Sequence, residues 1–346
     1  MTEKATDKPT AFFSAKWLYN RKKTATITFR IPHERTTGDV FMYYFIINPT
    51  SSSGGGQKIW NHTEEILQTE NIPYEAFLLS RDGEATVLAR KISGRPDPCT
   101  IVVIGGDGTI NEVINGIRDF SRVTLGCIPS GSGNDFIRGM NLPASPDDMI
   151  SIILHPRKFQ EINIGKVSAE GRSRCFAVSA GMGFDADICY HVMHSRMKPL
   201  LNRFHAGHLI YTAVAVRLLL TMKRQPLRIV VDGSRLISCH RGYFTAIMNL
   251  PYEGGGFRFC PKAMSGDGLL DLCIIDRLSR PKALLCFPLA YLGRHTAIKG
   301  VQILQCRKVT VQNEEPLCVH VDGEHFGFCK KITVQPIAHK LTVITG

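Results

Sequence analysis

The sequence predicts an α/β fold in which an N-terminal α/β domain is followed by a second domain built mainly of strands. Two observations carry this prediction. Apolar strand-like runs alternate with helical segments from residue 41 to about residue 163, and short strand-like runs dominate after that point. A chain of 346 residues is long enough to form two domains with sizeable cores.

The first half has the pattern of successive βαβ units. Strands are expected at residues 42–48, 74–79, 100–104 and 123–129, and helices at residues 58–71, 84–92 and 110–118. Strands that alternate with helices predict a parallel sheet, and such sheets bind ligands at the carboxyl ends of their strands. All the glycine-rich turns of this half fall at those ends.

The second half consists mainly of short strand-like runs. Strand-like runs occur at residues 175–181, 227–233, 243–249, 269–276, 308–312, 317–323 and 331–335. Only one long helical region, at residues 191–223, is expected to interrupt them, which predicts a mainly antiparallel domain. Residues 1–40 lack regular patterning and are expected to form an extension before the folded domains.

The composition argues against a membrane-spanning or disulfide-rich protein. Two apolar stretches, at residues 209–220 and 283–292, are interrupted by Arg217 and Pro288 and are shorter than the roughly 18 residues that span a bilayer. The first ten residues lack the apolar segment of a signal peptide, so a cytoplasmic location is expected. The eleven cysteines include no CxxC pair, which favours buried, reduced thiols over a zinc site.

The formal net charge of +12 suits anionic partners such as nucleotides, nucleic acid or acidic lipid head groups. The charge is uneven, because residues 195–241 hold nine Lys or Arg residues against one acid, Asp232. This stretch has two interpretations. It is either a basic amphipathic surface for an anionic bilayer or a solvated helix face.

The strongest motif is IGGDGTINE at residues 104–112, which follows a buried strand and opens a helix. Glycines let the backbone approach phosphates closely, and a helix N-terminus offers free N–H groups to an anion. Asp107 alone would repel phosphate, so its presence in this loop indicates Mg²⁺ between carboxylate and phosphate. The alternative is an aspartate that only stabilises a tight turn.

Two further loops fit the same site. NPTSSSGGG at residues 48–56 ends the first strand, and PSGSGND at residues 129–135 ends another and supplies a second carboxylate, Asp135. Three such loops at one sheet edge predict a polyphosphate site. The loops match neither the Walker A motif nor the GxGxxG fingerprint.

Together with GDGLLDL at residues 266–272 and VDGE at residues 321–324, these motifs resemble the diacylglycerol kinase catalytic-domain family. That family includes soluble bacterial diacylglycerol kinases and the sphingosine and ceramide kinases. The resemblance covers residues 42–346 and implies a three-layer α/β nucleotide-binding domain at residues 41–163 and a β-sandwich lipid-substrate domain at residues 164–325. Residues 326–346 are expected to return toward the N-terminal domain, and residues 1–40 lie outside the resemblance.

The resemblance also implies roles for individual residues. Asp107 and Asp135 match aspartates that hold the Mg²⁺ of the nucleotide through water, and Glu324 matches the catalytic base. A structural Mg²⁺ site of bacterial members matches Asp267 and the main-chain oxygens of Met264 and Leu269. The implied ATP contacts are Asn48, Thr50, Ser80, Gly105, Gly106, Asp107, Gly108, Thr109, Asn111, Glu112, Gly131, Ser132 and Asn134.

Several alternatives stay open beside these roles. Soluble bacterial members have a third aspartate where this chain has Asn163, and a neutral amide attracts Mg²⁺ less. His325 is a rival for the role of base, and Asp322-Gly323 is also the signature of a simple hairpin turn. Residues 253–256, EGGG, are either a mobile loop near the lipid or an ordinary turn.

The expected activity is ATP-dependent, Mg²⁺-assisted phosphorylation of a lipid hydroxyl, with diacylglycerol as the first choice of acceptor. Alternatives are a sphingoid base or other lipid alcohol, a soluble acceptor as in NAD kinases, or a nucleotide-binding regulatory protein with weak turnover. The expected partners are a lipid alcohol and an anionic membrane surface, with a peripheral location at the inner membrane. Nucleic acid is not expected, and a homodimer is an open alternative.

Overall fold

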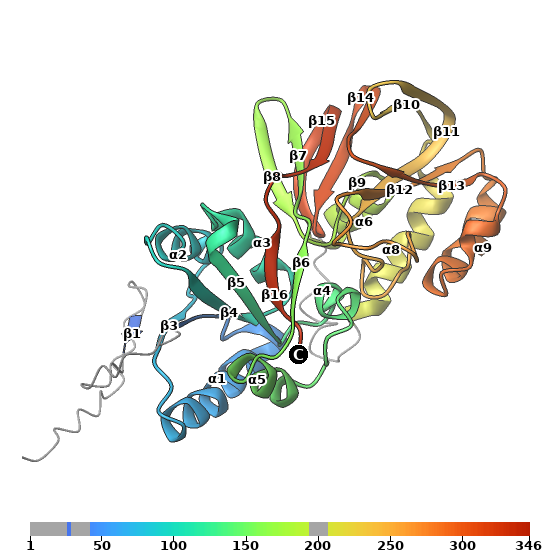
Figure 1. Cartoon of the computed structure of the whole chain (residues 1–346). Helices are drawn as coiled ribbons and strands as arrows, with labels where there is room; N and C mark the ends of the chain where they lie inside the picture. The colour runs from blue at the N-terminus through green and yellow to red at the C-terminus, as the bar shows by residue number, and fades with distance from the viewer. Residues whose placement is uncertain (1–25, 29–41, 194–206) are drawn as a thin grey trace, which may run out of the picture.

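The computed structural model describes residues 26–28, 42–193 and 207–346 (Figure 1). They form two sheets, one of seven strands and one of nine. Of the extension expected at residues 1–40, the described part is β1, which pairs antiparallel with β3. No helix in the described ranges is long and apolar enough to cross a membrane.

The first sheet has the strand order β1-β3-β2-β4-β5-β16-β6, and its central pairs are parallel. Its strands are β1 (Thr26–Thr28), β2 (Tyr43–Ile47), β3 (Tyr74–Leu78), β4 (Cys99–Gly105), β5 (Val123–Pro129), β6 (Phe159–Ile162) and β16 (Leu341–Ile344). Every residue of β2, β4 and β16 except Thr342 is buried, as expected for strands covered on both faces.

Helices cover both faces of this sheet and make it a three-layer domain, as predicted. In Figure 1, α1 and α5 lie on one side of the sheet, and α2 and α3 lie on the other. The helices are α1 (Ser51–Thr69), α2 (Glu84–Ile92), α3 (Asp107–Gly116), α4 (Asp135–Gly139) and α5 (Pro146–Leu154), with a 3₁₀ turn at Phe120–Arg122. The helix expected at residues 58–71 begins earlier, because the NPTSSSGGG loop already forms the irregular first turn of α1.

The strand order places a topological switch point beside β2. The chain passes from β2 to its neighbour β3 and then crosses to β4 on the opposite side of β2. Crevices form outside the carboxyl ends of strands where the order reverses in this way. Here those ends carry the Asn48 loop after β2 and the Gly106 loop after β4.

The second sheet folds over an apolar core as a β-sandwich, with the strand order β13-β12-β11-β10-β14-β15-β7-β8. β9 and β10 each lie between β11 and β14 and pair with both, but at different ends of these long strands. The strands are β7 (Gly165–Ala169), β8 (Arg172–Phe176), β9 (Ser179–Gly183), β10 (Gln225–Val231), β11 (Arg235–Met248), β12 (Leu270–Asp276), β13 (Val301–Cys306), β14 (Val309–Val321) and β15 (Glu324–Pro336).

The helices of the second domain differ from the prediction. The helical region expected at residues 191–223 is described as α6 (Phe184–Met193) and α8 (Gly207–Thr221), and residues 194–206 lie outside the described ranges. The expectation of one long helical region was wrong, because α9 (Arg280–Tyr291) follows β12, with a 3₁₀ turn at His295–Ala297. α8 and α9 pack on the outer face of β11 and β12, where Phe244 and Cys273 join a separate apolar cluster.

The end of the chain connects the two domains. Residues 326–336 remain in β15 of the second sheet, so the segment in the first sheet is shorter than residues 326–346. β16 inserts between β5 and β6, parallel to the first and antiparallel to the second. In Figure 1 it runs as a dark red strand from the second domain back into the first.

Candidate active site at the junction of the domains

The loop after β2 is tied to both of the other glycine-rich loops. Asn48 Oδ1 accepts hydrogen bonds from the amide (3.2 Å) and hydroxyl (2.9 Å) of Thr50, and its Nδ2 donates to Thr109 Oγ1 at 3.4 Å. The hydroxyls of Ser51 and Ser130 lie 2.7 Å apart. The three loops predicted to share a sheet edge therefore do so.

The loops after β4 and β5 touch through their backbones. A Cβ added to Gly131 would lie 2.6 Å from the Cα of Gly106, and one added to Gly106 would lie 3.1 Å from the Cα of Gly131. Only glycines allow this approach. Asn134 closes the second loop, because its side chain accepts from the Gly131 amide (3.2 Å) and donates to the Gly131 carbonyl (3.0 Å). Ser132, at the tip of the same loop, is exposed.

Asp107 begins α3 and also caps α4. Its two carboxylate oxygens accept hydrogen bonds from the backbone amides of Asp135 (3.0 Å) and Phe136 (2.9 Å). A carboxylate that accepts N–H groups at a helix start satisfies donors that have no intrahelical partner. Asp107 thus has a structural role, although it caps α4 instead of stabilising its own turn, and each oxygen keeps a second lone pair.

Asp135 is buried beside Asp107 and has few charges to balance it. Burial, followed by the negative charge of Asp107, raises the pKa of Asp135 to about 7. The amide of Gly255 (2.8 Å) and the guanidinium of Arg138 (2.8 Å) act in the opposite direction. A Cβ added to Gly133 would lie 3.1 Å from a carboxylate oxygen of Asp107 and 3.9 Å from one of Asp135, and two such neighbouring carboxylates suit Mg²⁺.

Glu324 is brought to these loops by the second domain. It begins β15 after a two-residue turn, in which Asp322 (φ 50°) and Gly323 (φ 78°) adopt the left-handed conformation of a hairpin. The Glu324 carboxylate points at the start of α3, because its Oε1 would lie 3.3 Å from a Cβ added to Gly108. The hairpin alternative and the catalytic interpretation are therefore compatible.

His325, the rival candidate, belongs to a different cluster. Its ring centre lies 5.0 Å from that of Tyr190, in a tilted arrangement, and 5.3 Å from that of Phe328, edge to face, and its Nδ1 lies 3.4 Å from Cys318 Sγ. These contacts hold the imidazole among α6, β14 and β15. Glu324 and not His325 adjoins the phosphate loops.

Asp322 fixes the hairpin to the rest of the molecule, a role that the sequence analysis missed. Its carboxylate accepts from the amides of Ala177 (3.0 Å), Val178 (2.9 Å) and Ser179 (2.9 Å) between β8 and β9. It also accepts from Nδ2 of Asn111 on α3 at 2.8 Å. This single side chain therefore joins the two domains directly behind Glu324.

Three of the residues expected to contact ATP have other partners in the structure. Asn111 is fully buried and bonds to Asp322 and to the Arg174 guanidinium, so it serves the domain interface. Glu112 Oε1 accepts from the amide of Gly83 at 3.0 Å. Ser80 donates through its amide and hydroxyl to the carboxylate of Glu84.

The residues expected to hold a structural Mg²⁺ lie in one loop between the domains. Asp267 is exposed, and its carboxylate accepts from the amide of Leu269 (2.9 Å) and from Gln305 (3.3 Å). Asn163 donates its Nδ2 to the carbonyl oxygen of Leu269 at 3.2 Å. An amide donor thus occupies one side of this carbonyl, where an aspartate would require a cation, and the structural Mg²⁺ site stays a prediction. Met264, whose main-chain oxygen was the third expected ligand, is exposed in the same loop.

A buried cluster not predicted from the sequence lies behind the Glu324 hairpin. His320 Nε2 is 3.2 Å from a carboxylate oxygen of Asp185 and 3.2 Å from one of Glu253, and all three residues are buried. Its Nδ1 accepts from the Gly323 amide at 3.2 Å, so the ring proton sits on Nε2. If Nε2 bound a metal, the ring proton would have to sit on Nδ1. It would then face the N–H of Gly323, and two donors would point at each other. The cluster therefore fits a shared proton better than a metal. Burial correspondingly raises the pKa of Asp185.

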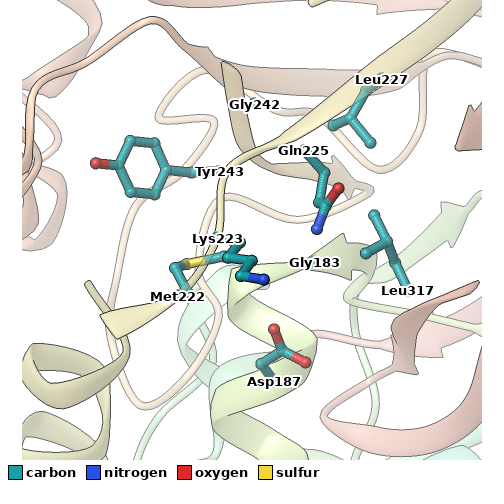
Figure 2. Close-up of a pocket in the computed structure, with 9 residues that line it drawn as sticks. All are labelled: Gly183, Asp187, Met222, Lys223, Gln225, Leu227, Gly242, Tyr243 and Leu317. Carbon is teal, nitrogen blue, oxygen red and sulfur yellow. The ribbon is translucent and has the colours of Figure 1, made fainter. Parts of the chain in front are cut away.

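A cavity of about 190 Å³ opens where β9 ends and β10 begins (Figure 2). Figure 2 shows the polar ends of Asp187, Lys223 and Gln225 directed into it, with Leu227 and Leu317 on one side. Burial, followed by the charge of Asp185, raises the pKa of Asp187 to about 6. The cavity is smaller than the roughly 300–1,000 Å³ of most ligand pockets, so it is too small for a lipid chain.

Comparison with known proteins agrees with this geometry. Residues 42–167 match the diacylglycerol kinase catalytic domain, and residues 178–345 match the YegS C-terminal NAD kinase beta sandwich-like domain. The chain is 30% identical over 293 residues to a diacylglycerol kinase of Bacillus subtilis (strain 168), across 82% of this chain and 89% of that protein. It is 28% identical to a presumed lipid kinase of the same organism, YtlR, across 82% and 94%.

Solved structures show the same fold. A diacylglycerol kinase structure from Bacillus anthracis str. Sterne superposes with a TM-score of 0.65 at 19% identity, covering 89% of this chain and 97% of the other. The fold and the site define a kinase. The chain belongs to the diacylglycerol kinase catalytic-domain family of lipid kinases, and this membership implies ATP as the phosphoryl donor.

Proposed function

We propose that this enzyme transfers the γ-phosphoryl group of ATP to the hydroxyl of diacylglycerol and forms phosphatidic acid. The observation that carries the proposal is the approach of Glu324, from the second domain, to Gly108 at the start of α3 in the first. A phosphoryl transfer requires a phosphate site and a group that takes the acceptor proton. The approach of Glu324 brings the two together across the domain junction.

The three loops supply the phosphate site. The free N–H groups at the start of α3 and the exposed hydroxyl of Ser132 would be the donors for phosphate oxygens. The close contact of Gly106 with Gly131 keeps the loops rigid, so the donors need no rearrangement during the reaction. Transfer then depends mainly on the alignment of acceptor and phosphate.

Asp107 and Asp135 would hold Mg²⁺ through water, because both carboxylates lie beside Gly133 and the burial of Asp135 disfavours its negative charge without a cation. The ion would neutralise charge on the phosphates. Glu324 would accept the hydroxyl proton as the new O–P bond forms, and Asp322 would keep the hairpin in place.

Diacylglycerol is proposed as acceptor because relatives that match most of the chain carry the name diacylglycerol kinase, from Bacillus subtilis and from Staphylococcus haemolyticus. Another lipid alcohol would use the same chemistry. Because such acceptors reside in bilayers, we also propose peripheral binding to an anionic membrane surface, which the net charge of +12 favours.

Glu324→Gln tests the proposal. The amide keeps the size of the side chain but cannot take a proton, so kcat should fall about 10²- to 10⁴-fold while ATP affinity stays nearly unchanged. His325→Ala is the matched control and should retain most of its activity, because that ring contacts Tyr190 and Phe328. Near-normal turnover of Glu324→Gln beside an inactive His325→Ala would transfer the role of base to the histidine.

The acceptor is tested in the same assay. Diacylglycerol, a sphingoid base, NAD and a no-acceptor control are offered with ATP, and products are identified by mass spectrometry. Phosphatidic acid should dominate. Phosphorylation of NAD, or nucleotide binding without any product, would overturn the proposal.

A further inference from the structure

α9 buries mainly small side chains against the second domain and exposes several large apolar ones. Its buried side chains are the small ones, Ala283, Cys286 and Ala290, each at most 5% exposed. Phe287 is half-buried against the core, but other large apolar side chains point outward, with Leu285 62% exposed and Leu292, directly after the helix, 57% exposed. A surface helix normally buries its large apolar residues, so an outward-facing set calls for a partner.

The exposed residues form one continuous stripe. Leu284, Leu285, Pro288, Tyr291 and Leu292 occupy positions i, i+1, i+4, i+7 and i+8, which span about 120° of a helix with 100° per residue. This is the width of a helix face that packs on an apolar layer. All five are exposed, while the opposite side of α9 lies on the domain core.

The segment that contains the stripe is positively charged. Residues 277–299 contain Arg277, Arg280, Lys282, Arg294 and Lys299 and no acid. Arg277 pairs with Asp276. Within the described ranges, none of the other four forms an ion pair. An apolar helix face accompanied by unpaired cations is typical of helices that lie in the interface of an anionic bilayer.

The stripe ends beside the candidate active site. A Cβ added to Gly256 would lie 3.1 Å from the ring of Tyr291 and 3.4 Å from Arg138. Gly255, in the same glycine loop, donates its amide to Asp135. A bilayer in contact with α9 would therefore lie next to the loop that adjoins the phosphate site.

We propose that α9 is the membrane-docking element of this enzyme and that its occupant is a bilayer containing anionic lipids. The proposal rests on the lipid kinase function proposed above and names the surface that brings the enzyme to its substrate. A second copy of the chain is a poorer occupant. A two-fold dimer places the same face of both copies together, and this face would bring its own positive charges into contact.

Docking is tested by vesicle co-sedimentation without ATP or acceptor. The full chain is mixed with phosphatidylcholine vesicles that contain or lack phosphatidylglycerol. Leu285→Ser/Leu292→Ser removes apolar area from the stripe and should weaken binding to anionic vesicles at least tenfold, at roughly 0.8 kcal/mol per buried methylene. Lys282→Ala should weaken it about fivefold, at about 1 kcal/mol per cation.

Leu236→Ser is the matched control, because Leu236 is 53% exposed on β11 and is not part of the stripe. It should bind like the wild type. Thermal denaturation and activity on a short-chain, micelle-dispersed acceptor should be the same for all variants, since none of these side chains lies in the catalytic loops.

Equal binding of the double variant and the wild type, or equal binding to neutral and anionic vesicles, would overturn the proposal. A wild-type dimer that becomes monomeric in the double variant, seen by analytical ultracentrifugation, would assign α9 to self-association instead. Vesicle binding is measured without turnover. Binding without kinase activity would refute the proposed function alone, and kinase activity without stripe-dependent binding would refute the docking role alone.

Discussion

At the scale of single residues, the motifs predicted which loops come together, but the partners of each side chain needed coordinates. The position of Glu324 at the end of a hairpin turn could be predicted because Asp-Gly before it favours that turn. Asn111 could not be assigned correctly, because its place one turn into α3 turns its amide toward Arg174 and Asp322 of the other domain. No sequence pattern could join Asp185, Glu253 and His320, which are far apart in the chain.

Asn163 gives a prediction at this scale. It is 3% exposed and donates to the Leu269 carbonyl, so Asn163→Asp would face that carbonyl with a buried carboxylate. Without a cation this should cost about 2–4 kcal/mol and lower Tm by several degrees. Millimolar Mg²⁺ should restore much of the loss by bridging the two oxygens.

Asn163→Ala is the control for this measurement. It also removes the donor, but it offers no oxygen to a metal, so Mg²⁺ should not raise its Tm. If Mg²⁺ has the same effect on both variants, the amide of Asn163 does not stand in the place of a cation.

At the scale of elements, the first domain was predictable because its signals are local. Buried strands such as β4 are continuous apolar runs, and each glycine loop marks a strand end. α9 was missed because Pro281 and Pro288 interrupt its sequence and because its apolar residues face outward as well as inward. The double role of the loop after β4 was also hidden, since the cap it provides belongs to α4, in a distant part of the sequence.

That cap leads to a prediction for Asp107→Asn. An asparagine can accept from only one of the two amides and places an N–H₂ group against the other. The variant should lose about 1–2 kcal/mol of stability along with most of its turnover, so the loss of activity should not be purely a metal effect.

Thermal unfolding and a kinase assay would separate the two losses. Asp147→Asn is the matched control, as Asp147 is an exposed aspartate in the first turn of α5 and, among the described residues, pairs with His62 at 3.6 Å. It should leave both quantities nearly unchanged. Wild-type stability in Asp107→Asn would show that the cap contributes nothing.

At the scale of the whole molecule, the sequence changes near residue 163 from alternating strands and helices to mainly strands. This change coincides with the boundary between the sheets, since β6 belongs to the first sheet and β7 to the second. The pairing of β9 and β10 with different ends of both β11 and β14 could not be predicted. Pairing of that kind depends on strand ends meeting across the fold and not on the pattern within any one strand.

β16 yields the prediction at this scale. Val343 is fully buried, opposite Leu125 of β5 and Gln160 of β6. Val343→Asp places a charge in the core and should cost about 3–5 kcal/mol. Nucleotide binding should be lost together with stability, because the phosphate loops are at the ends of strands in this sheet.

Thr342→Asp is the companion variant, since Thr342 is only partly buried and alternates to the other face of the strand. It should be tolerated better in thermal denaturation. Equal effects of the two substitutions would mean that β16 does not contribute its buried face to the core.

The position of β16 has a consequence for how the protein is made. The ribosome synthesises β2 to β6 early. The gap between β5 and β6 can be filled by β16 only after the ribosome has synthesised the entire second domain. Domains generally fold in order of synthesis, and here that order leaves the first sheet open until late. An interrupted translation product would carry all three phosphate loops on an incomplete sheet, so premature products should be recognised and degraded rather than bind nucleotide.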